Sequence, residues 1–413
     1  MRRWERRLKD LSMSLEACGT SYFDPERFRL NANHFLTTAR TVSFLFQKDK
    51  ASIQDFDAWH LNNIYNPWHA DTIMKWSIAS RNTIEKEGDL DLHSTVNATL
   101  IFGYIEEQDV AISLEKQTYL NASVKRLIRF ARTKLPSGVS DSAVIRVDRR
   151  WVANTLPEFE LLQAFRYIYT RMHEACESLS KHLHTSLESS IPEPTSFDET
   201  STGSRGTHYI PLNSNLIHTV VAQRHSVDKN FNPPPWLNKI SEDKNLAPPN
   251  SLPTLMEFHE KMAHANFMAF GNHLAMLWLY NDKFEPIDFI GTAPENQTAK
   301  FIFWRTVSDR IHYLKAKYLI WVSEAWIRKG VDKRMRTPVR NLPIIGEFLQ
   351  VVGIGGEDQY LKVSWDIKRE NKDSTPNLVL RPPPEGDYKE EVNYLIPARR
   401  ALNKVNNSCA KKV

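Results

Sequence analysis

The sequence predicts an α+β protein, with a mainly helical N-terminal domain that has added strands, followed by a smaller α+β domain with a hairpin. Three observations support this fold class. Apolar residues recur with helical spacing over residues 25–48. They alternate with polar residues over residues 90–102, as in a strand that has one polar face. Over residues 346–371, two alternating segments flank "GIGGED", which is the pattern of a hairpin.

The N-terminal elements are predicted from caps and periodicity. Asp24 can cap the helix at 25–48, and a second helix is expected at 70–87, with Gly88 as its terminator. The further elements expected are an amphipathic helix at the N-terminus, a helix at 121–135, a strand within 140–157 and a long helix at 157–184. These elements predict a first domain that closes near residue 190.

The C-terminal half combines helical and strand patterns. A helix is expected over residues 254–280, and a second helix from residue 300 leads into a buried strand at 318–322. The domain limits that follow are a helical domain at 1–190, a linker or irregular connection at 191–252, an α+β domain at 253–400 and a loose basic tail at 401–413.

Composition excludes several classes of protein. The chain has 413 residues, of which 41% are hydrophobic, enough for more than one core. Its apolar segments fall well short of the roughly 20 residues that cross a bilayer, and the charged N-terminus does not resemble a secretion signal. We therefore expect a cytosolic protein without membrane contact. Three distant cysteines predict neither a disulfide framework nor a zinc site, and no cofactor is indicated.

The segment "SRNTIEKEG" has a pattern that is found in a known family. Arg81 is followed by the polar Asn82, then by the hydrophobic Ile84, the basic Lys86 and the terminating Gly88. This order resembles the signature of HEPN domains, small helical bundles common in bacterial toxins and defence proteins. The resemblance covers residues 20–190 at most.

The resemblance implies metal-independent RNA cleavage by an endoribonuclease of bacterial defence or stress type, which acts as a homodimer. Arg81 would stabilise the charge that develops on the phosphoryl oxygens, beside Asn82. HEPN domains place a histidine base where this chain has Lys86, and a lysine with a pKa of about 10.4 is protonated at pH 7. His93, on the following strand, is the alternative base. The implied catalytic set is therefore Arg81, Asn82, Lys86 and His93.

Two other interpretations of this segment remain open. Arg81 and Lys86 can form ion pairs with Glu85 or Glu87 at the end of a helix, where cations also suit the helix dipole. Alternatively, they can bind phosphate without cleaving RNA.

A second basic segment supports phosphate contact independently of the motif. On a helix at 121–135, Lys125, Arg129 and Arg132 align along one face. Such a row of cations can follow a nucleic-acid backbone. The alternative is an ordinary solvated helix face. The residues predicted to bind nucleic acid are Lys125, Arg126, Arg129, Arg132, Arg146, Arg149 and Arg150.

The C-terminal half offers a rival from another class of enzyme. Asp366 and Lys368 lie two residues apart on a predicted strand, so both side chains would share one face. A metal-dependent nuclease uses such a pair with an upstream acid, for which Glu357, Asp358 or Glu324 could serve. Strand alternation also explains the pair without any metal. A further alternative is a non-enzymatic scaffold or interaction protein, in which the C-terminal domain binds a protein partner.

Two further polar features occur in the predicted helices and strands of the C-terminal half. His259 and His264 are five residues apart, which rotates them by about 140° on a helix and prevents them from sharing one metal. Glu324 lies between two tryptophans, a setting that can raise the pKa of its carboxyl. Glu324 could equally pair with Arg305 or Arg310.

Overall fold

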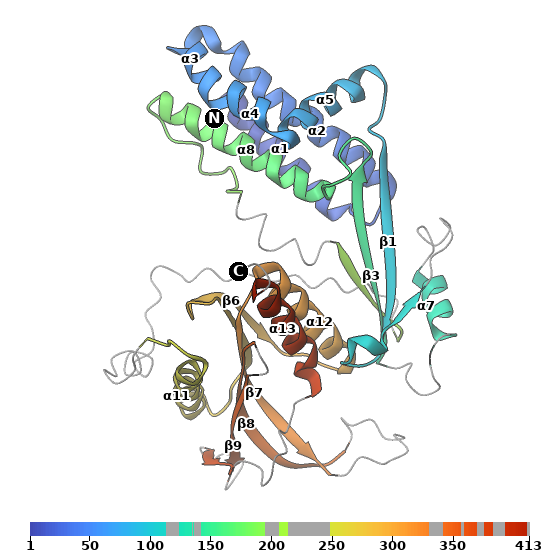
Figure 1. Cartoon of the computed structure of the whole chain (residues 1–413), viewed down its shortest axis with the longest axis vertical. Helices are drawn as coiled ribbons and strands as arrows, with labels where there is room; N and C mark the ends of the chain where they lie inside the picture. Colours follow the sequence, from blue (N-terminus) through green and yellow to red (C-terminus); the bar gives the residue numbers. More distant parts are fainter. Residues whose placement is uncertain are drawn as a thin grey trace. The chain divides into compact units, whose positions relative to one another are not determined.

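The computed structural model describes residues 1–112, 124–133, 135, 142–194, 206–213, 248–329, 342–356, 359–369, 376–382 and 393–410. The chain divides into two compact units, the first made of residues 1–101 and 110–223 and the second of 102–109 and 224–413. Helices dominate the first unit and the larger sheet belongs to the second (Figure 1), which confirms the predicted α+β class. The domain limits at 190 and 253 stay predictions.

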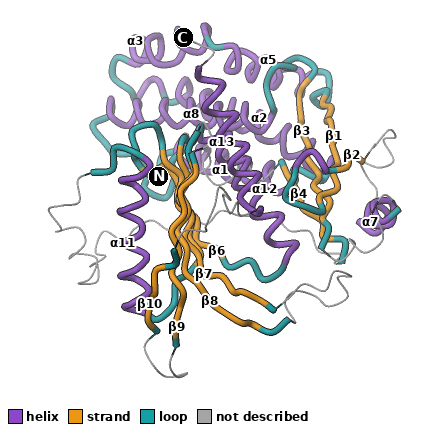
Figure 2. The backbone as a smooth tube through the Cα atoms, turned by 60° about the horizontal axis from the view of Figure 1, so that its bottom comes forward, coloured by secondary structure: helices purple, strands orange, loops and turns teal. Residues whose placement is uncertain are grey.

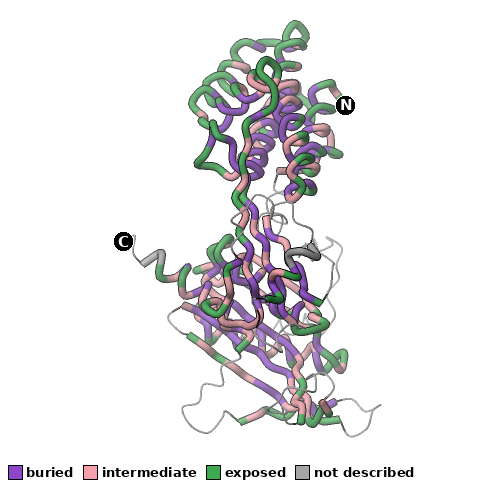
Figure 3. The backbone as a smooth tube through the Cα atoms, turned by 90° about the vertical axis from the view of Figure 1, so that its right-hand side faces the viewer, coloured by how far each residue is buried: buried purple, intermediate pink, exposed green. Residues whose placement is uncertain are grey.

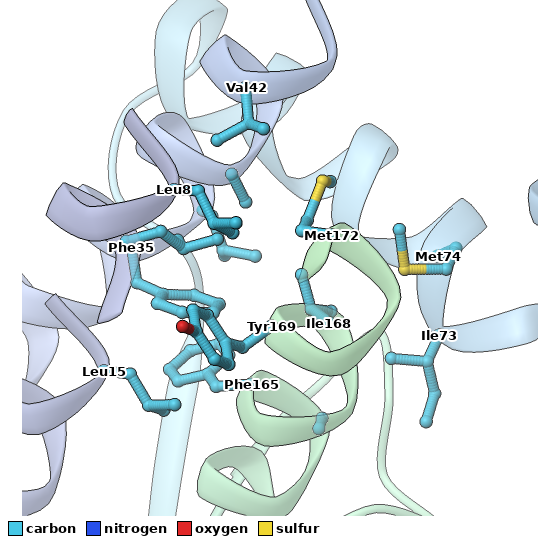
Figure 4. Close-up of a cluster of buried hydrophobic side chains, with 14 of the residues drawn as sticks. Leu8, Leu15, Phe35, Val42, Ile73, Met74, Phe165, Ile168, Tyr169 and Met172 are labelled. Atoms are coloured by element: carbon cyan, nitrogen blue, oxygen red, sulfur yellow. The ribbon is translucent and has the colours of Figure 1, made fainter. Parts of the chain in front are cut away.

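The helices of the first unit form a bundle around one core. Its long helices are α1 (Arg3–Thr20), α2 (Pro25–Lys48), α5 (Thr72–Lys86) and α8 (Leu161–His182), and its short ones are η1 (Lys50–Ser52), α3 (Phe56–His60), η2 (Leu61–Tyr65) and α4 (Asn66–Ala70). Leu8, Phe35, Met74 and Phe165, one from each long helix, are buried in one core cluster (Figure 4). Burial of these apolar faces is the main stabilising contribution to the bundle.

Capping side chains set where these helices begin. Asp24 accepts a hydrogen bond from the backbone N–H of Arg27 at 3.3 Å, and α2 begins at Pro25 as the sequence predicted. The long helix expected from Pro157 begins later, at Leu161. The reason is Glu160, whose carboxylate accepts the backbone N–H groups of the first turn of α8.

A four-stranded antiparallel sheet completes the described part of the first unit, in the order β2-β1-β3-β4. Its strands are β2 (Val110–Ile112), β1 (Leu92–Ile101), β3 (Val144–Ala153) and β4 (Thr207–Pro211), and the short helix α7 (Val124–Arg132) lies between β2 and β3 in sequence. Val96 lies opposite Arg149, so these two residues share one face of the sheet. Trp151 shares that face and packs into the helical core.

The second unit is a six-stranded antiparallel sheet in the order β10-β9-β8-β7-β5-β6. Its strands are β5 (Ala275–Tyr280), β6 (Pro286–Thr292), β7 (Tyr318–Arg328), β8 (Ile344–Ile354), β9 (Tyr360–Lys368) and β10 (Asn377–Leu380). Helix α11 (Leu252–Phe270) packs on one face, whereas α12 (Gln297–Leu314) and α13 (Ile396–Ala410) pack on the other (Figure 2). The pairing of β8 with β9 confirms the predicted hairpin.

The prediction of one helix over residues 254–280 is wrong. Helix α11 ends at Phe270, because Gly271 adopts a left-handed conformation with φ of 70°. The following residues form β5, in which Leu277 and Leu279 face the α12 side of the sheet and Tyr280 faces the α11 side. A short apolar run supports either a helix or a strand, and here contacts on both faces of the sheet decide for the strand.

The prediction of a loose tail is also corrected. Residues 401–410 lie in α13, whose Ala401, Leu402 and Val405 are buried in the same cluster as α12. Val405 lies four residues after Ala401 and three after Leu402, which places all three on one helix face and explains why the segment folds despite its basic residues. Residues 411–413 lie outside the described part of the chain.

Residues 102–109 belong to the second unit, although they connect two strands of the first. They contain η3 (Glu106–Gln108), and Tyr104 packs edge-on against Phe301 of α12, with ring centroids 4.9 Å apart. Arg305 of α12 pairs with Glu106 at 3.1 Å and with Asp109 at 2.8 Å. The connection therefore packs against α12 of the second unit.

Buried residues are concentrated in the helices and strands of each unit. Buried stretches run along the helices of the first unit and along the central strands of the second (Figure 3). None of the described helices is both long and apolar enough to span a membrane. A cytosolic location stays a prediction.

Lowering the pH from 7 to 5 is expected to cost the second unit about 2 kcal/mol of its free energy of unfolding through His259. Burial, with a smaller contribution from His273, lowers the pKa of the folded His259 to about 3. Its Nε2 lies 2.7 Å from the hydroxyl of Tyr280. The unfolded imidazole has a pKa of about 6.5, so between these values the unfolded state binds more protons and stability falls as the pH falls.

Urea unfolding at pH 7 and pH 5, with hydrogen exchange of α11 as the readout, measures this loss. The variant His259→Gln should have a smaller pH dependence than the original chain. If the free energy of unfolding changes equally with pH in the variant and the original chain, the assignment to His259 is contradicted.

Candidate functional site

The residues of the predicted catalytic motif do not converge. Nη2 of Arg81 pairs with Oε2 of Glu85 at 2.6 Å, one helical turn further along α5, and Nη1 contacts the side-chain oxygen of Asn82 at 3.3 Å. Lys86 is exposed at the end of the same helix. His93 is exposed on β1, opposite Val152, and no hydrogen bond or ion pair among the described residues joins it to Arg81. Arg81 therefore has the local ion pair with Glu85 that the ion-pair interpretation of this segment predicted.

Strand β3 separates the cations that the sequence placed together. Arg146 and Arg150 point to one face of the sheet, and Arg149 points to the other, because side chains alternate along a strand. Nε of Arg146 contacts both carboxylate oxygens of Asp148, at 3.0 and 2.9 Å. Arg150 is exposed and lies 3.4 Å from the carbonyl oxygen of Glu158.

The cations of α7 are only partly described. Arg129 is exposed, and Nη2 of the exposed Arg132 donates a hydrogen bond to the carbonyl oxygen of Leu212 at 2.7 Å. The side chains of Lys125 and Arg126 lie outside the described residues. In the part of the segment that the structure describes, the arginines thus have different partners, and those of β3 lie on opposite faces of the sheet.

The proposed metal-nuclease pair is part of a surface ion-pair group. Asp366 lies 3.1 Å from Nε of Arg381 and 3.9 Å from Nζ of Lys368. Glu324 is on the opposite, α11 face of the sheet, and Glu357 and Asp358 lie outside the described residues. Across the ranges that the structure describes, no group of three or more histidine, cysteine, aspartate or glutamate side chains is arranged to hold a metal ion.

Glu324 has the raised pKa that its sequence setting suggested. Burial raises the pKa of its carboxyl, and a hydrogen bond from the backbone N–H of His273 opposes this shift. Arg305 and Arg310 pair elsewhere, Arg310 with Asp288 at 2.6 Å. Glu324 therefore anchors the loop between α11 and β5.

The most unusual polar group in the first unit is the side chain of Arg149. The residue is only 6% exposed, and its Nε and Nη1 atoms are buried without a hydrogen-bond acceptor. No carboxylate of the described residues forms an ion pair with it. Its guanidinium instead lies 5.2 Å from the ring centre of Trp151 and 5.8 Å from that of Phe23. Burial lowers the pKa of Arg149.

The side chains around Arg149 come from four separate elements. His208 of β4 stacks on Phe23 with ring centroids 3.6 Å apart, and burial together with the nearby Arg149 lowers the pKa of His208 to about 4. Tyr22 contacts Oε1 of Glu160 at 2.8 Å and the backbone oxygen of Arg149 at 3.0 Å. We call Phe23, Arg149, Trp151 and His208 the Arg149 cage.

The sequence indicated this cage only weakly. Arg149 was one of seven cations assigned to a nucleic-acid surface, and no sequence pattern distinguished it from Arg150. Alternation along β3 was the available signal, because Arg149 falls in phase with the buried Val147 and Trp151.

The second unit carries an exposed apolar surface on the α11 side of its sheet. Helix α11 contacts β7, β8 and β9, and its His259 also packs against Trp278 and Tyr280 of β5, so that the open part of the hairpin is on the β6 side. There Trp278 pairs with Phe289 across the strands, with ring centroids 5.2 Å apart, and Phe289 is 50% exposed. Met276 lies opposite Gly291, and a side chain at Gly291 would meet no atom within 4 Å. We call Met276, Trp278, Phe289 and Gly291 the β5–β6 face.

These features define a two-unit α+β protein with a buried guanidinium in an aromatic setting and an open apolar sheet face. The chain belongs to the phage lambda Ea47 family, since the family model described as "Bacteriophage lambda protein ea47" matches residues 1–209 and 239–378. "Protein ea47" of Escherichia phage lambda is 41% identical to it over 380 residues, which are 91% of this chain and 92% of that protein. No solved structure matches this chain.

Family membership corrects the functional predictions. The resemblance to HEPN domains is wrong, because the family match covers most of the chain and assigns the chain to the phage lambda Ea47 family instead. The RNA-binding, ribonuclease and defence functions that the resemblance implied lose their support with it. The physical reason for the error is the shortness of the motif, since an arginine, an amide and a basic residue also occur at an ordinary helix end that is closed by an i,i+4 ion pair.

Proposed function

We propose that this chain is a non-catalytic interaction protein whose second unit binds a protein partner on the β5–β6 face. The observation that carries the proposal is the exposed Phe289 beside a free strand edge. Among the described residues, β6 pairs only with β5, so its outer backbone groups are available to another strand.

The opposite face of β6 is closed by the unit itself. Asp288 and Arg310 of α12 form an ion pair, with side chains only 7% and 14% exposed, and Ile290 packs against the α12 cluster. A partner can therefore gain apolar contacts only on the α11 side. Gly291 leaves an open position beside Phe289, which suits an incoming apolar side chain.

The geometry favours an extended partner segment over a helix. Strand addition uses main-chain hydrogen bonds along the edge for affinity and alternate side chains for specificity. Exposed carboxylates flank β6, with Asp282 and Glu285 before it and Glu295 after it, against the single Lys283. The partner expected is a protein with an alternating apolar segment flanked by basic residues.

Phe289→Asp is expected to weaken binding of this partner by about 30-fold, because an apolar contact near the centre of an interface is worth about 2 kcal/mol. A photoreactive phenylalanine at position 289 of the full chain first identifies the partner in cells that produce it. The affinity of the purified partner is then measured by calorimetry. The variant Gly291→Val supplies a second test, because it fills the open position without adding charge and should also weaken binding.

The matched control is Phe44→Asp, which alters a 55% exposed phenylalanine on α2 of the first unit. Its affinity for the partner should equal that of the original chain. A partner whose affinity is unchanged by Phe289→Asp would contradict the proposal. Analytical ultracentrifugation of the purified chain tests a second copy as the occupant, since a homodimer formed at this edge would be lost in Phe289→Asp.

A further inference from the structure

Arg149 differs in its partners from the buried Arg305 and the partly buried Arg310. Arg305 has two carboxylate partners and Arg310 has one, as expected for cations removed from water. Arg149 has aromatic rings and no carboxylate partner among the described residues, and two of its nitrogens lack acceptors. Cation–π contacts compensate only part of the desolvation of a guanidinium.

We propose that the Arg149 cage binds a small oxyanion, a carboxylate or phosphate group, whose oxygens accept the unused N–H groups of Arg149. Such a ligand supplies both the missing negative charge and the missing hydrogen-bond acceptors. Charge-assisted hydrogen bonds from arginine to carboxylate or phosphate are among the strongest in proteins. Nε and Nη1 belong to different edges of the guanidinium, so a group with several oxygens satisfies them better than a single acceptor.

The rings of the cage determine how a ligand reaches Arg149. Phe23 and His208 are partly exposed, whereas Trp151 is buried in the helical core, so the stacked pair separates the guanidinium from solvent. His208 is neutral at pH 7 and can donate one N–H group to an anion.

The charges around the cage make His208 a reporter of the ligand. The charged and titratable groups around the cage are Arg149 on β3, which acts on His208, and Tyr22 after α1 and Glu160 at the start of α8, which are hydrogen-bonded to each other. Arg149 is the cation that disfavours the imidazolium. An anion bound to Arg149 removes this repulsion and favours protonation of His208.

The test uses the full chain and inorganic phosphate, with sodium chloride adjusted so that ionic strength stays constant. Phosphate should raise the thermal unfolding midpoint of the first unit in a saturable manner, because a ligand of the folded state stabilises it. It should also raise the pKa of His208 in NMR titrations by about one unit, a tenfold change in its protonation constant. A parallel titration with acetate distinguishes a planar carboxylate site from a phosphate site.

Two variants separate ligand binding from a structural role. Arg149→Met should abolish both phosphate effects, while its stability without phosphate stays close to that of the original chain, since an apolar side chain of similar length replaces an unpaired charge. Arg150→Met, the neighbour on the opposite face of β3, should keep both effects. If neither phosphate nor acetate stabilises the original chain or changes the titration of His208, the proposal fails. An unchanged phosphate response in Arg149→Met would also overturn it.

Discussion

Replacing Arg305 with alanine is expected to lower the free energy of unfolding of the second unit by about 3–5 kcal/mol. The side chain of Arg305 is 4% exposed and joins α12 to the segment 102–109. Its removal leaves the carboxylates of Glu106 and Asp109 without this counter-charge in a partly buried setting. It also removes a donor to the backbone oxygen of Gly103, at 3.3 Å. The segment should therefore detach from α12 before the sheet unfolds.

Urea unfolding combined with hydrogen exchange measures this effect, because exchange reports the opening of residues 102–109 separately from that of the sheet and helices of the second unit. Arg400→Ala is the matched control, since Arg400 pairs with Glu107 of the same segment but its side chain is 35% exposed. An exposed ion pair contributes little, so the control should cost less than about 1 kcal/mol. If Arg305→Ala and Arg400→Ala have equal effects, burial of the Arg305 ion pairs does not hold the segment.

Replacing Phe165 with alanine is expected to cost the first unit about 3–5 kcal/mol. Phe165 is fully buried on α8, and its ring centre lies 4.5 Å from that of Phe35 on α2 and 6.4 Å from that of Trp76 on α5. Removal of the ring leaves a cavity where three helices meet, in addition to the lost apolar burial. The measurement is urea unfolding, with hydrogen exchange of α2 and α8 as the readout for this unit.

Phe44→Ala provides the comparison for this truncation. Phe44 also lies in the helical bundle, but it is 55% exposed, so little apolar surface and no cavity are involved. Its effect should stay within about 0.5 kcal/mol. A loss of similar size in both variants would mean that Phe165 is not at the centre of the core.

The two proposed binding sites, the β5–β6 face and the Arg149 cage, can be tested independently. The β5–β6 face belongs to the second unit and the Arg149 cage to the first. Phe289→Asp should therefore leave the phosphate response of His208 unchanged, and Arg149→Met should leave partner affinity unchanged. Failure of one proposal does not imply failure of the other.

Local signals predicted many of the elements correctly. Asp24 and Pro25 indicated the start of α2, and alternation indicated β1 and the β8–β9 hairpin. These signals succeed because caps and periodicity act within a few residues of the chain. The same local information failed at residues 275–280, where the choice between helix and strand depended on β6, β7 and the helices on both faces.

The candidate sites were less accessible to sequence reasoning. Arg149 and Arg150 are adjacent and chemically identical, yet one is buried beneath aromatic rings and the other is exposed. Phe289 gave no sequence signal, since its exposure depends on how far α11 extends across the sheet. Contacts between residues distant in sequence decide both cases.

The sequence by itself determined the α+β class, the start of α2 and the periodicity of the long N-terminal helices, of β1 and of the β8–β9 hairpin, because backbone caps and side-chain alternation depend on neighbouring residues. Only the tertiary structure decided which charges are paired and which apolar residues are covered. Arg81 forms an ion pair with a carboxylate one helical turn away, and Arg305 forms ion pairs with two carboxylates of the distant segment 102–109. Arg149 has no carboxylate partner among the described residues. The partners of Arg305 and the burial of Arg149 depend on distances in the folded chain, and for this reason residue type and spacing could not predict them, whereas the i,i+4 pair of Arg81 was among the pairs that spacing allowed.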